Sequence, residues 1–217
     1  MEEAMQQLCL KNRDMINIEI KSWCRITNTK VLLNGEELEI PLRENTSWLT
    51  NIYKSQKIDY PKYFKMDTLS KAGFLASEII MRSLNIDPLE PKPKWSIISM
   101  NSSSSLETDK NYQQTIQDTN NYFPSPSVFV YTLANIVTGE IAIRNKIMGE
   151  TLFFVHKDFS PHHLYQYSID ALSNDSIENL LCGWVEDGDN NIDVLMFALK
   201  KNTKVNNFNI ENIKTIY

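Results

Sequence analysis

The amino-acid sequence predicts an α/β fold in which helices cover a mixed β-sheet. Short apolar runs typical of strands alternate along the chain with longer stretches of helical periodicity. A chain of 217 residues with 42% hydrophobic content is long enough for one large core, and no internal repeat divides it. We therefore expect a single domain over residues 1–217, with a polar N-terminal segment at 1–14 and a polar tail from about 201 to 217.

The first predicted elements are strands. Residues Met15–Thr27 alternate isoleucine with polar side chains, which is typical of a half-buried strand. The dipeptide Asn34-Gly35 then predicts a hairpin turn between residues 31–33 and 38–42. A helix is predicted from Asp67, a good N-cap, to near Asn85. Its buried face is expected to carry Leu69, Ala72, Ala76, Ile79 and Ser83.

The middle of the chain continues the alternation. Three prolines make residues 87–94 a loop, and Trp95–Met100 is a short apolar strand. Residues Ser102–Ser105 lack the glycines of a phosphate-binding loop and predict a turn. Ser104 and Glu107 form a capping box, which predicts a polar surface helix to about Thr119.

A second group of elements follows a turn at Pro124 and Pro126. Residues 127–132 have the composition of a strand, although they could instead be a connecting segment that leads into the next helix. That helix, Asn135–Met148, is nearly all apolar and should be buried on most sides. Thr151–Val155 is predicted as a strand.

The last predicted helix begins at Ser160-Pro161, where a capping serine precedes a proline at the first helical position, and runs to about Ser173. Two strands, 179–186 and 192–201, follow on either side of the turn Asp187–Asn190. The remaining residues form the polar tail, whose last five residues are IKTIY.

Charge and cysteine content exclude several classes of function. Lys and Arg total 22 against 27 for Asp and Glu, a net charge of -5, which argues against a nucleic-acid partner. Cys9, Cys24 and Cys182 are widely spaced and odd in number, so we expect reduced, mostly buried thiols and neither a disulfide framework nor a zinc site. With no signal-like N-terminus and no apolar run of membrane-spanning length, the prediction is a cytoplasmic protein without a cofactor.

Residues Asn135–Val155, which follow the pattern N-x-x-x-G-x-x-x-I, resemble the region before the active-site cysteine of β-ketoacyl-acyl-carrier-protein synthases. Continued without a gap, the resemblance places that cysteine at Asp158, the following helix at Phe159–Ser173 and the family's G-G-x-E strand end at 183–186. A second match upstream, Tyr63–Gly73, is similar to the basic-K-M-D stretch of the family.

The resemblance covers about Asp59 to Lys200 and implies the N-terminal half of a thiolase-like layered fold. Members of the family are about twice as long, and their two catalytic histidines lie in the second half, so His156, His162 and His163 take no such role. A ketosynthase needs a thiolate at the helix N-terminus, and a carboxylate is a poor nucleophile toward thioesters. Asp158 is therefore expected to be a degenerate nucleophile position.

By resemblance, the chain is similar to the non-catalytic chain length factors of polyketide and aryl-polyene or flexirubin pigment pathways. This implies a dimer of the chain with an active ketosynthase or with itself. The interface would contain Thr151, Phe153, Phe154, His156 and Phe159, and the large side chains among them would also limit the depth of the acyl tunnel. It also implies docking of an acyl carrier protein, an acidic partner, by Lys62, Lys65 and Lys71. Half of a two-halved fold would expose apolar surface and require a partner.

Two other hypotheses stay open. The chain could be a stand-alone interaction or structural protein, in which the three lysines are a solvated face and Asp158 is an ordinary carboxylate at a helix start. Alternatively, Asp158 could hydrolyse or decarboxylate a carrier-bound acyl group. His162 and His163 lack the further ligands that a metal site would need.

Overall fold

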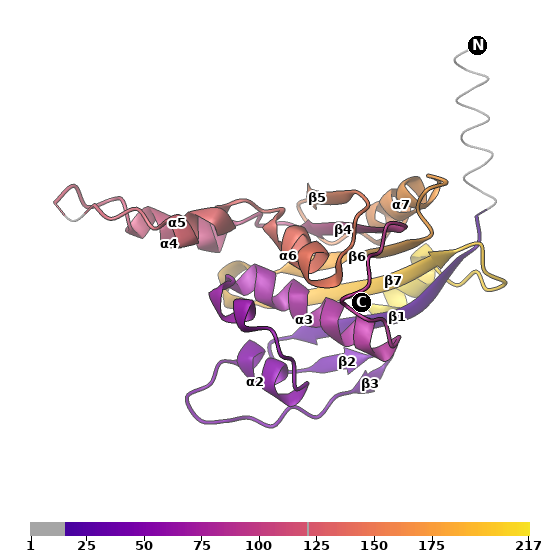
Figure 1. Cartoon of the computed structure of the whole chain (residues 1–217), viewed down its shortest axis with the longest axis horizontal. Helices are drawn as coiled ribbons and strands as arrows, with labels where there is room; N and C mark the ends of the chain where they lie inside the picture. Colours follow the sequence, from indigo (N-terminus) through magenta and orange to yellow (C-terminus); the bar gives the residue numbers. More distant parts are fainter. Residues whose placement is uncertain (1–15, 121) are drawn as a thin grey trace, which may run out of the picture.

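The structure, a computed structural model, describes residues 16–120 and 122–217 and confirms the predicted α/β fold. Seven strands of the described chain form one mixed sheet in the order β3-β2-β1-β7-β6-β4-β5 (Figure 1). They are β1 (Ile18–Thr27), β2 (Val31–Leu33), β3 (Glu36–Glu37), β4 (Trp95–Asn101), β5 (Thr151–Val155), β6 (Asn179–Glu186) and β7 (Asp193–Lys201).

The sheet has a parallel part and an antiparallel part. Strand β4 pairs in parallel with β5 on one side and with β6 on the other. From β6 onward through β7, β1, β2 and β3 every pair is antiparallel. At Gly183 in β6 a side chain would collide with the backbone of Leu195 in β7, so only glycine permits the close approach of these two strands.

Helices cover both faces of the sheet. One apolar cluster packs α2 (Trp48–Ser55), α3 (Thr68–Ser83) and α6 (Ile136–Asn145) against one face, and a second packs α7 (Pro161–Leu172) and α8 (Ile210–Ile216) against the other. Asp67 caps α3 by accepting a hydrogen bond from the Ser70 amide at 2.9 Å, as predicted. Gly73 keeps α3 close to α6, because a Cβ there would lie 2.6 Å from Val137.

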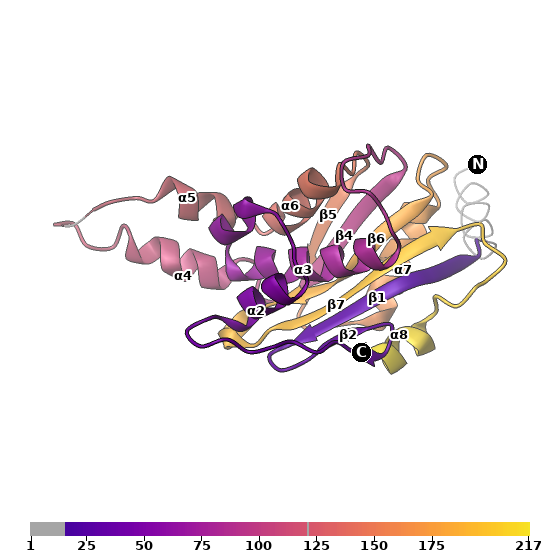
Figure 2. The ribbon, with the colours of Figure 1, turned by 60° about the horizontal axis from the view of Figure 1, so that its bottom comes forward.

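Between β4 and α6 the chain leaves the body of the molecule. Helices α4 (Leu106–Gln114) and α5 (Pro126–Phe129) project together beyond the ends of the strands in both views (Figures 1 and 2). The rings of Tyr112 and Phe129 hold the two helices together, with centroids 5.3 Å apart. We call residues 102–120 and 122–135 the arm.

Several predicted elements differ in the structure. The second hairpin strand was predicted at residues 38–42, but it consists of Glu36–Glu37, and residues 38–42 form no strand. The capping box at Ser104 is wrong: Ser105 occupies the N-cap position, Ser104 has a left-handed φ of 55°, and α4 ends at Gln114. The strand-like residues 127–132 are helical, forming the end of α5 and the 3-10 helix η2 (Val130–Thr132).

Other differences concern two elements that were not predicted, the length of α6 and the C-terminal residues. Helix α2 and the 3-10 helix η1 (Pro61–Lys65) were not predicted, and α6 is shorter than 135–148 and leaves Ile143 64% exposed. The C-terminal residues are not merely a polar tail, because Phe208 and Ile213 are buried beneath α7 and β7. The polar segment 1–14 and Cys9 lie outside the described residues.

No single helix in the described ranges is both long and apolar enough to cross a membrane. Residues 126–132 and 136–145 meet that test of length and composition only as a pair bent by 100°.

Candidate functional site

The predicted strand-turn-helix site is present at the end of β5. The His156 amide donates to the Asn101 carbonyl at 2.8 Å, which fixes the exit of the strand. Ser160 caps α7 by accepting a hydrogen bond from the His163 amide at 3.3 Å, and Pro161 occupies the first turn, as predicted. Asp158 lies two residues before this cap and is exposed, so Ser160, not Asp158, is the capping residue of α7.

The site lacks an activated thiol within the described chain. Cys24 and Cys182 are both free and fully buried, as predicted for core thiols. Burial raises the pKa of Cys182 to about 12, with a partly opposing hydrogen bond from Ser168, and burial also raises the pKa of Cys24. Neither can serve as a nucleophile near neutral pH, because the reactive species is the thiolate. The interpretation of Asp158 as a degenerate nucleophile position stays a prediction.

The three histidines gather beside β5. The rings of His156 and His163 stack with centroids 4.4 Å apart, and the Tyr167 hydroxyl lies 3.1 Å from Nε2 of His156. Tyr167 in turn stacks on Phe154 at 4.1 Å. Partial burial and the neighbouring His163 lower the pKa of His156. These contacts join the end of β5 to α7, and no cluster of metal-binding side chains occurs among the residues that the structure describes.

The predicted interface and tunnel residues divide between two faces of the sheet. Phe153 packs toward the cluster under α3 and α6, whereas Phe154 packs toward α7. Phe159 lies away from the edge strand, because its ring stacks on Tyr217 at 4.0 Å and meets Trp184 at 5.8 Å. Thr151 begins β5 and His156 follows its last residue, whereas Phe154 and Phe159 both pack against the cluster on the side of α7 and α8.

A carboxylate that the sequence did not single out organises the end of β6, at the same edge of the sheet as the ends of β4 and β5. Glu186, the last residue of β6, accepts hydrogen bonds from the amides of Ser102 and Ser103 at 2.7 and 3.1 Å and from both of their hydroxyls. The amides of Asp187 and Gly188 donate to it at 3.0 and 2.9 Å. Burial favours the neutral acid, but the hydrogen bonds from Ser102, Ser103 and Gly188 prevail and lower the pKa of Glu186.

The next residue, Asp187, behaves in the opposite way. It is only 5% exposed, and burial together with the charges of Asp67, Glu186 and Glu107 raises its pKa to about 7. It lines a cavity of about 360 Å³ between the start of α3 and the arm. Two predicted docking residues, Lys65 and Lys71, line the same cavity.

The three lysines differ in their surroundings. Lys62 pairs with the buried Glu140 at 2.7 Å, and Glu140 also accepts a hydrogen bond from the Tyr131 hydroxyl at 3.0 Å. Lys71 is half-buried with its ammonium 5.9 Å from the Tyr63 ring centroid, and burial lowers its pKa despite the charge of Asp67. Lys65 is exposed. Of the three, Lys65 is the one most available to an acidic partner.

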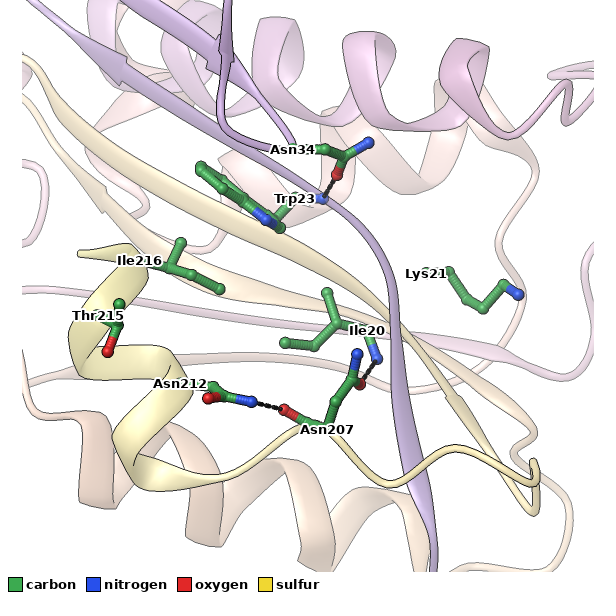
Figure 3. A pocket seen from close by; sticks show the side chains of 8 residues that line it. All are labelled: Ile20, Lys21, Trp23, Asn34, Asn207, Asn212, Thr215 and Ile216. Carbon is green, nitrogen blue, oxygen red and sulfur yellow. Dashed lines mark hydrogen bonds between the residues drawn. The ribbon is translucent and has the colours of Figure 1, made fainter.

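A separate pocket of about 380 Å³ lies between β1, the β2–β3 turn and α8, away from these residues (Figure 3). Trp23, Ile20 and Ile216 form its apolar wall (Figure 3). Its asparagines are tied to the backbone, since Asn34 accepts from the Trp23 amide at 2.8 Å and Asn207 from the Ile20 amide at 2.7 Å. The pocket therefore owes its shape to the way the C-terminal segment is anchored to β1.

Comparison with known proteins supports the fold. No family model and no curated protein matches the sequence. Among solved structures, the ishigamide ketosynthase/chain length factor matches with a TM-score of 0.60 at 11% identity, over 85% of this chain and 62% of that chain. The chain has the fold of ketosynthases and chain length factors. It corresponds to the N-terminal, thiolase-like domain and spans less than two thirds of that first structure's length.

Two further structures agree. A ketosynthase in complex with its chain length factor from Xenorhabdus doucetiae matches with a TM-score of 0.56 at 13% identity, over 87% of this chain and 80% of that chain. The matched chain is thus only slightly longer than this one. The third structure is a type II polyketide synthase acyl carrier protein in complex with its ketosynthase bound to the hexaketide. It matches with a TM-score of 0.55 at 14% identity, over 85% of this chain and 62% of that chain.

Proposed function

We propose that the chain is a non-catalytic, ketosynthase-like subunit that pairs with a ketosynthase in the manner of a chain length factor, in fatty acid, polyketide or aryl-polyene-type synthesis. The observation that carries the proposal is the strand-turn-helix at β5 and α7, which presents the exposed carboxylate of Asp158 where the sequence resemblance expects a nucleophilic thiol. The solved structures with this fold include a ketosynthase bound to its chain length factor.

The distribution of exposed apolar side chains supports a partner. Most of the large apolar side chains that are exposed in the described residues lie within one stretch of the chain, on the arm, α6 and β5. We take this concentration as support for a surface that a partner covers. The members are Leu106, Tyr122, Phe123, Phe129, Val130, Leu133, Ile143, Met148, Leu152 and Val155.

Co-purification tests the proposal directly. An affinity-tagged copy of the chain is isolated from its native cells, and the proteins bound to it are identified together with the mass of the complex. Stoichiometric recovery of a ketosynthase supports the proposal, and recovery of the chain without any ketosynthase contradicts it.

Binding of an acyl carrier protein separates this function from that of a stand-alone structural protein. Lys65→Glu should weaken the binding of an acidic carrier protein because it reverses an exposed charge. Lys204→Glu, an equally exposed change at the other end of the sheet, is the matched control. Lys62 is unsuitable for this test, since Lys62→Glu would place a second carboxylate beside the buried Glu140.

An enzymatic role of Asp158 has its own test. If the chain hydrolysed or decarboxylated carrier-bound acyl groups, Asp158→Asn would abolish that activity, because the amide can act neither as a nucleophile nor as a base. Under the proposed function no such activity depends on Asp158, and acyl-carrier substrates are recovered unchanged with both proteins.

A further inference from the structure

All three histidines of the chain lie in one cluster at the end of β5. The rings of His156 and His163 stack with centroids 4.4 Å apart, and the His162 ring meets the His163 ring edge-on at 6.2 Å. His156 follows the last residue of β5, whereas His162 and His163 lie in the first turn of α7. Because the chain has no other histidine, every imidazole that titrates does so at this junction.

The stacked rings are part of the contact that holds the end of β5 against α7. Tyr167, one turn after His163, places its hydroxyl 3.1 Å from Nε2 of His156 and stacks its ring on Phe154 at 4.1 Å. Phe154 packs in turn against the core cluster on the α7 side of the sheet. The His156 amide donates to the Asn101 carbonyl at 2.8 Å, which completes the pairing of β5 with β4. We call His156, His163 and Tyr167 the latch.

The latch is open to solvent and lies on an uncovered strand. Within the described residues β5 pairs only with β4, so it is an edge strand, and its Val155 is 54% exposed. His163 is exposed and His156 is partly exposed, so protons from solvent reach both rings. His156 is also one of the residues that the sequence resemblance assigns to the interface with a partner.

The surroundings of His156 oppose its protonation. Partial burial and the positive charge of the protonated His163 both lower the pKa of His156. One proton on the stack leaves a cation over a neutral ring, but a second proton puts two positive charges 4.4 Å apart. The other titratable groups on the two elements that meet here are His162 and Tyr167 on α7 and Lys157 and Asp158 in the turn, while β4 contributes the uncharged Asn101.

We propose that the latch is a proton-operated switch, closed while at least one of its two imidazoles is neutral and opened when His156 and His163 are both protonated. Opening separates the two rings, releases His156 from Tyr167 and frees the end of β5 from α7. What the switch controls rests on the proposed function: His156 belongs to the predicted interface, so acidification weakens the binding of the ketosynthase partner.

The sign of the pH dependence follows from the direction of the shift. The closed latch holds the pKa of His156 below its ordinary value of 6.5, so the open state binds more protons than the closed state. The closed state is therefore favoured above pH 6.5 and is lost as the pH falls below that value.

NMR titration of the imidazole protons of the whole chain tests the coupling between the two rings. Three histidines give three sets of signals, and each set is assigned by its loss in a His→Gln variant. His163→Gln should raise the midpoint of His156 toward 6.5, because it removes the neighbouring charge. His162→Gln, the matched control, removes a histidine from the adjacent position, whose ring does not stack on His156, and should leave the midpoint nearly unchanged. A His156 midpoint that is the same in wild type and His163→Gln would overturn the proposal.

Amide hydrogen exchange tests the opening. The His156 amide is bonded at the latch, whereas the Ile97 amide, which donates to the Glu150 carbonyl at 3.0 Å, lies at the other end of the β4–β5 pair. Between about pH 7.5 and about pH 5.5, protection of the His156 amide relative to its intrinsic exchange rate should fall about tenfold in wild type but not in His163→Gln. Protection of the Ile97 amide should not change. Equal losses at both amides, or no loss at His156, would each contradict the switch.

The outcomes separate this inference from the proposed function, because both measurements use the chain alone. A switch that behaves as described in a chain that recovers no ketosynthase from cells supports the inference about the latch and contradicts the proposed function. A recovered ketosynthase should bind wild type about tenfold more weakly at about pH 5.5 than at about pH 7.5, and His163→Gln should reduce that difference. The same pH dependence with both proteins would leave the proposed function standing and overturn the switch.

Discussion

Asp187→Asn is expected to stabilise the protein at alkaline pH while changing little at acid pH. Asp187 is buried, and its pKa of about 7 exceeds the ordinary value of 3.8 because of burial and the nearby carboxylates of Asp67, Glu186 and Glu107. The folded protein therefore holds this proton up to about pH 7, whereas the unfolded chain releases it near pH 4. Between these limits the folded state binds more protons, so the free energy of unfolding falls as the pH rises.

The magnitude follows from the size of the shift. Each unit of pKa difference is worth about 1.4 kcal/mol, so ionising Asp187 in the folded protein costs about 4 kcal/mol over the whole range. From pH 5 to pH 8, where only the upper part of that range is crossed, wild type should lose about 3 kcal/mol through this residue. Asparagine keeps the shape of the neutral acid and does not ionise.

Urea unfolding at pH 5 and pH 8 checks the prediction. The variant should be about 1–2 kcal/mol more stable than wild type at pH 5 and about 4 kcal/mol more stable at pH 8, so that the difference grows by about 3 kcal/mol. The shifted pKa of His156 acts equally in both proteins and cancels, and Glu186 titrates below this window because its pKa is lowered. Asp175→Asn, at an exposed position, is the control. A difference between variant and wild type that is the same at both pH values would refute the reasoning.

Four further changes test the packing of the described residues. Glu186→Ala should lower the free energy of unfolding by roughly 1–3 kcal/mol in urea, since it leaves the part-buried amides of the Ser102–Ser103 turn without their acceptor; a loss below 1 kcal/mol would show that water replaces it. Gly183→Ala should prevent the β6–β7 approach and lower the melting temperature sharply, and a normal melting curve would disprove the clash with Leu195. Ile213→Ala should cost about 2–5 kcal/mol if α8 belongs to the core, against no effect if the C-terminal residues are dispensable. Phe159→Ala should reduce stability by removing contacts with Trp184 and Tyr217, and a change in product length without loss of stability would instead favour a tunnel role.

The elements with a clear local signal were predictable from the sequence. Strands β1, β4, β5, β6 and β7 follow from apolar runs of suitable length, and α3 and α7 begin at the residues where Asp67 and Ser160 can cap them. The capping box at Ser104 failed because the Asn101 side chain holds the amide and carbonyl of Ser104, whose φ is left-handed, so that the helix begins only after Ser105. Residues 127–132 have strand-like composition, but they lie in the arm, where no strand is available to pair with them.

The candidate site was predictable only in part. The turn around Asp158 and the cap at Ser160 follow from residue order, and burial of Cys182 follows from its place in an apolar strand. The roles of Glu186 and Asp187 could not be read in the same way, because their partners, Ser102 and Asp67, are far away in the chain. A signal was nevertheless present, since two successive carboxylates at the end of a buried strand must find donors or change their pKa.

The sequence by itself determined the α/β class and the order of most elements, because apolar periodicity and capping residues are properties of neighbouring positions. Only the tertiary structure decided which strand lies at the unprotected edge, which face each phenylalanine occupies and which carboxylate is charged. Strand order depends on crossovers between distant segments, and a pKa depends on burial and on charges brought close by folding. These properties arise only when the segments meet.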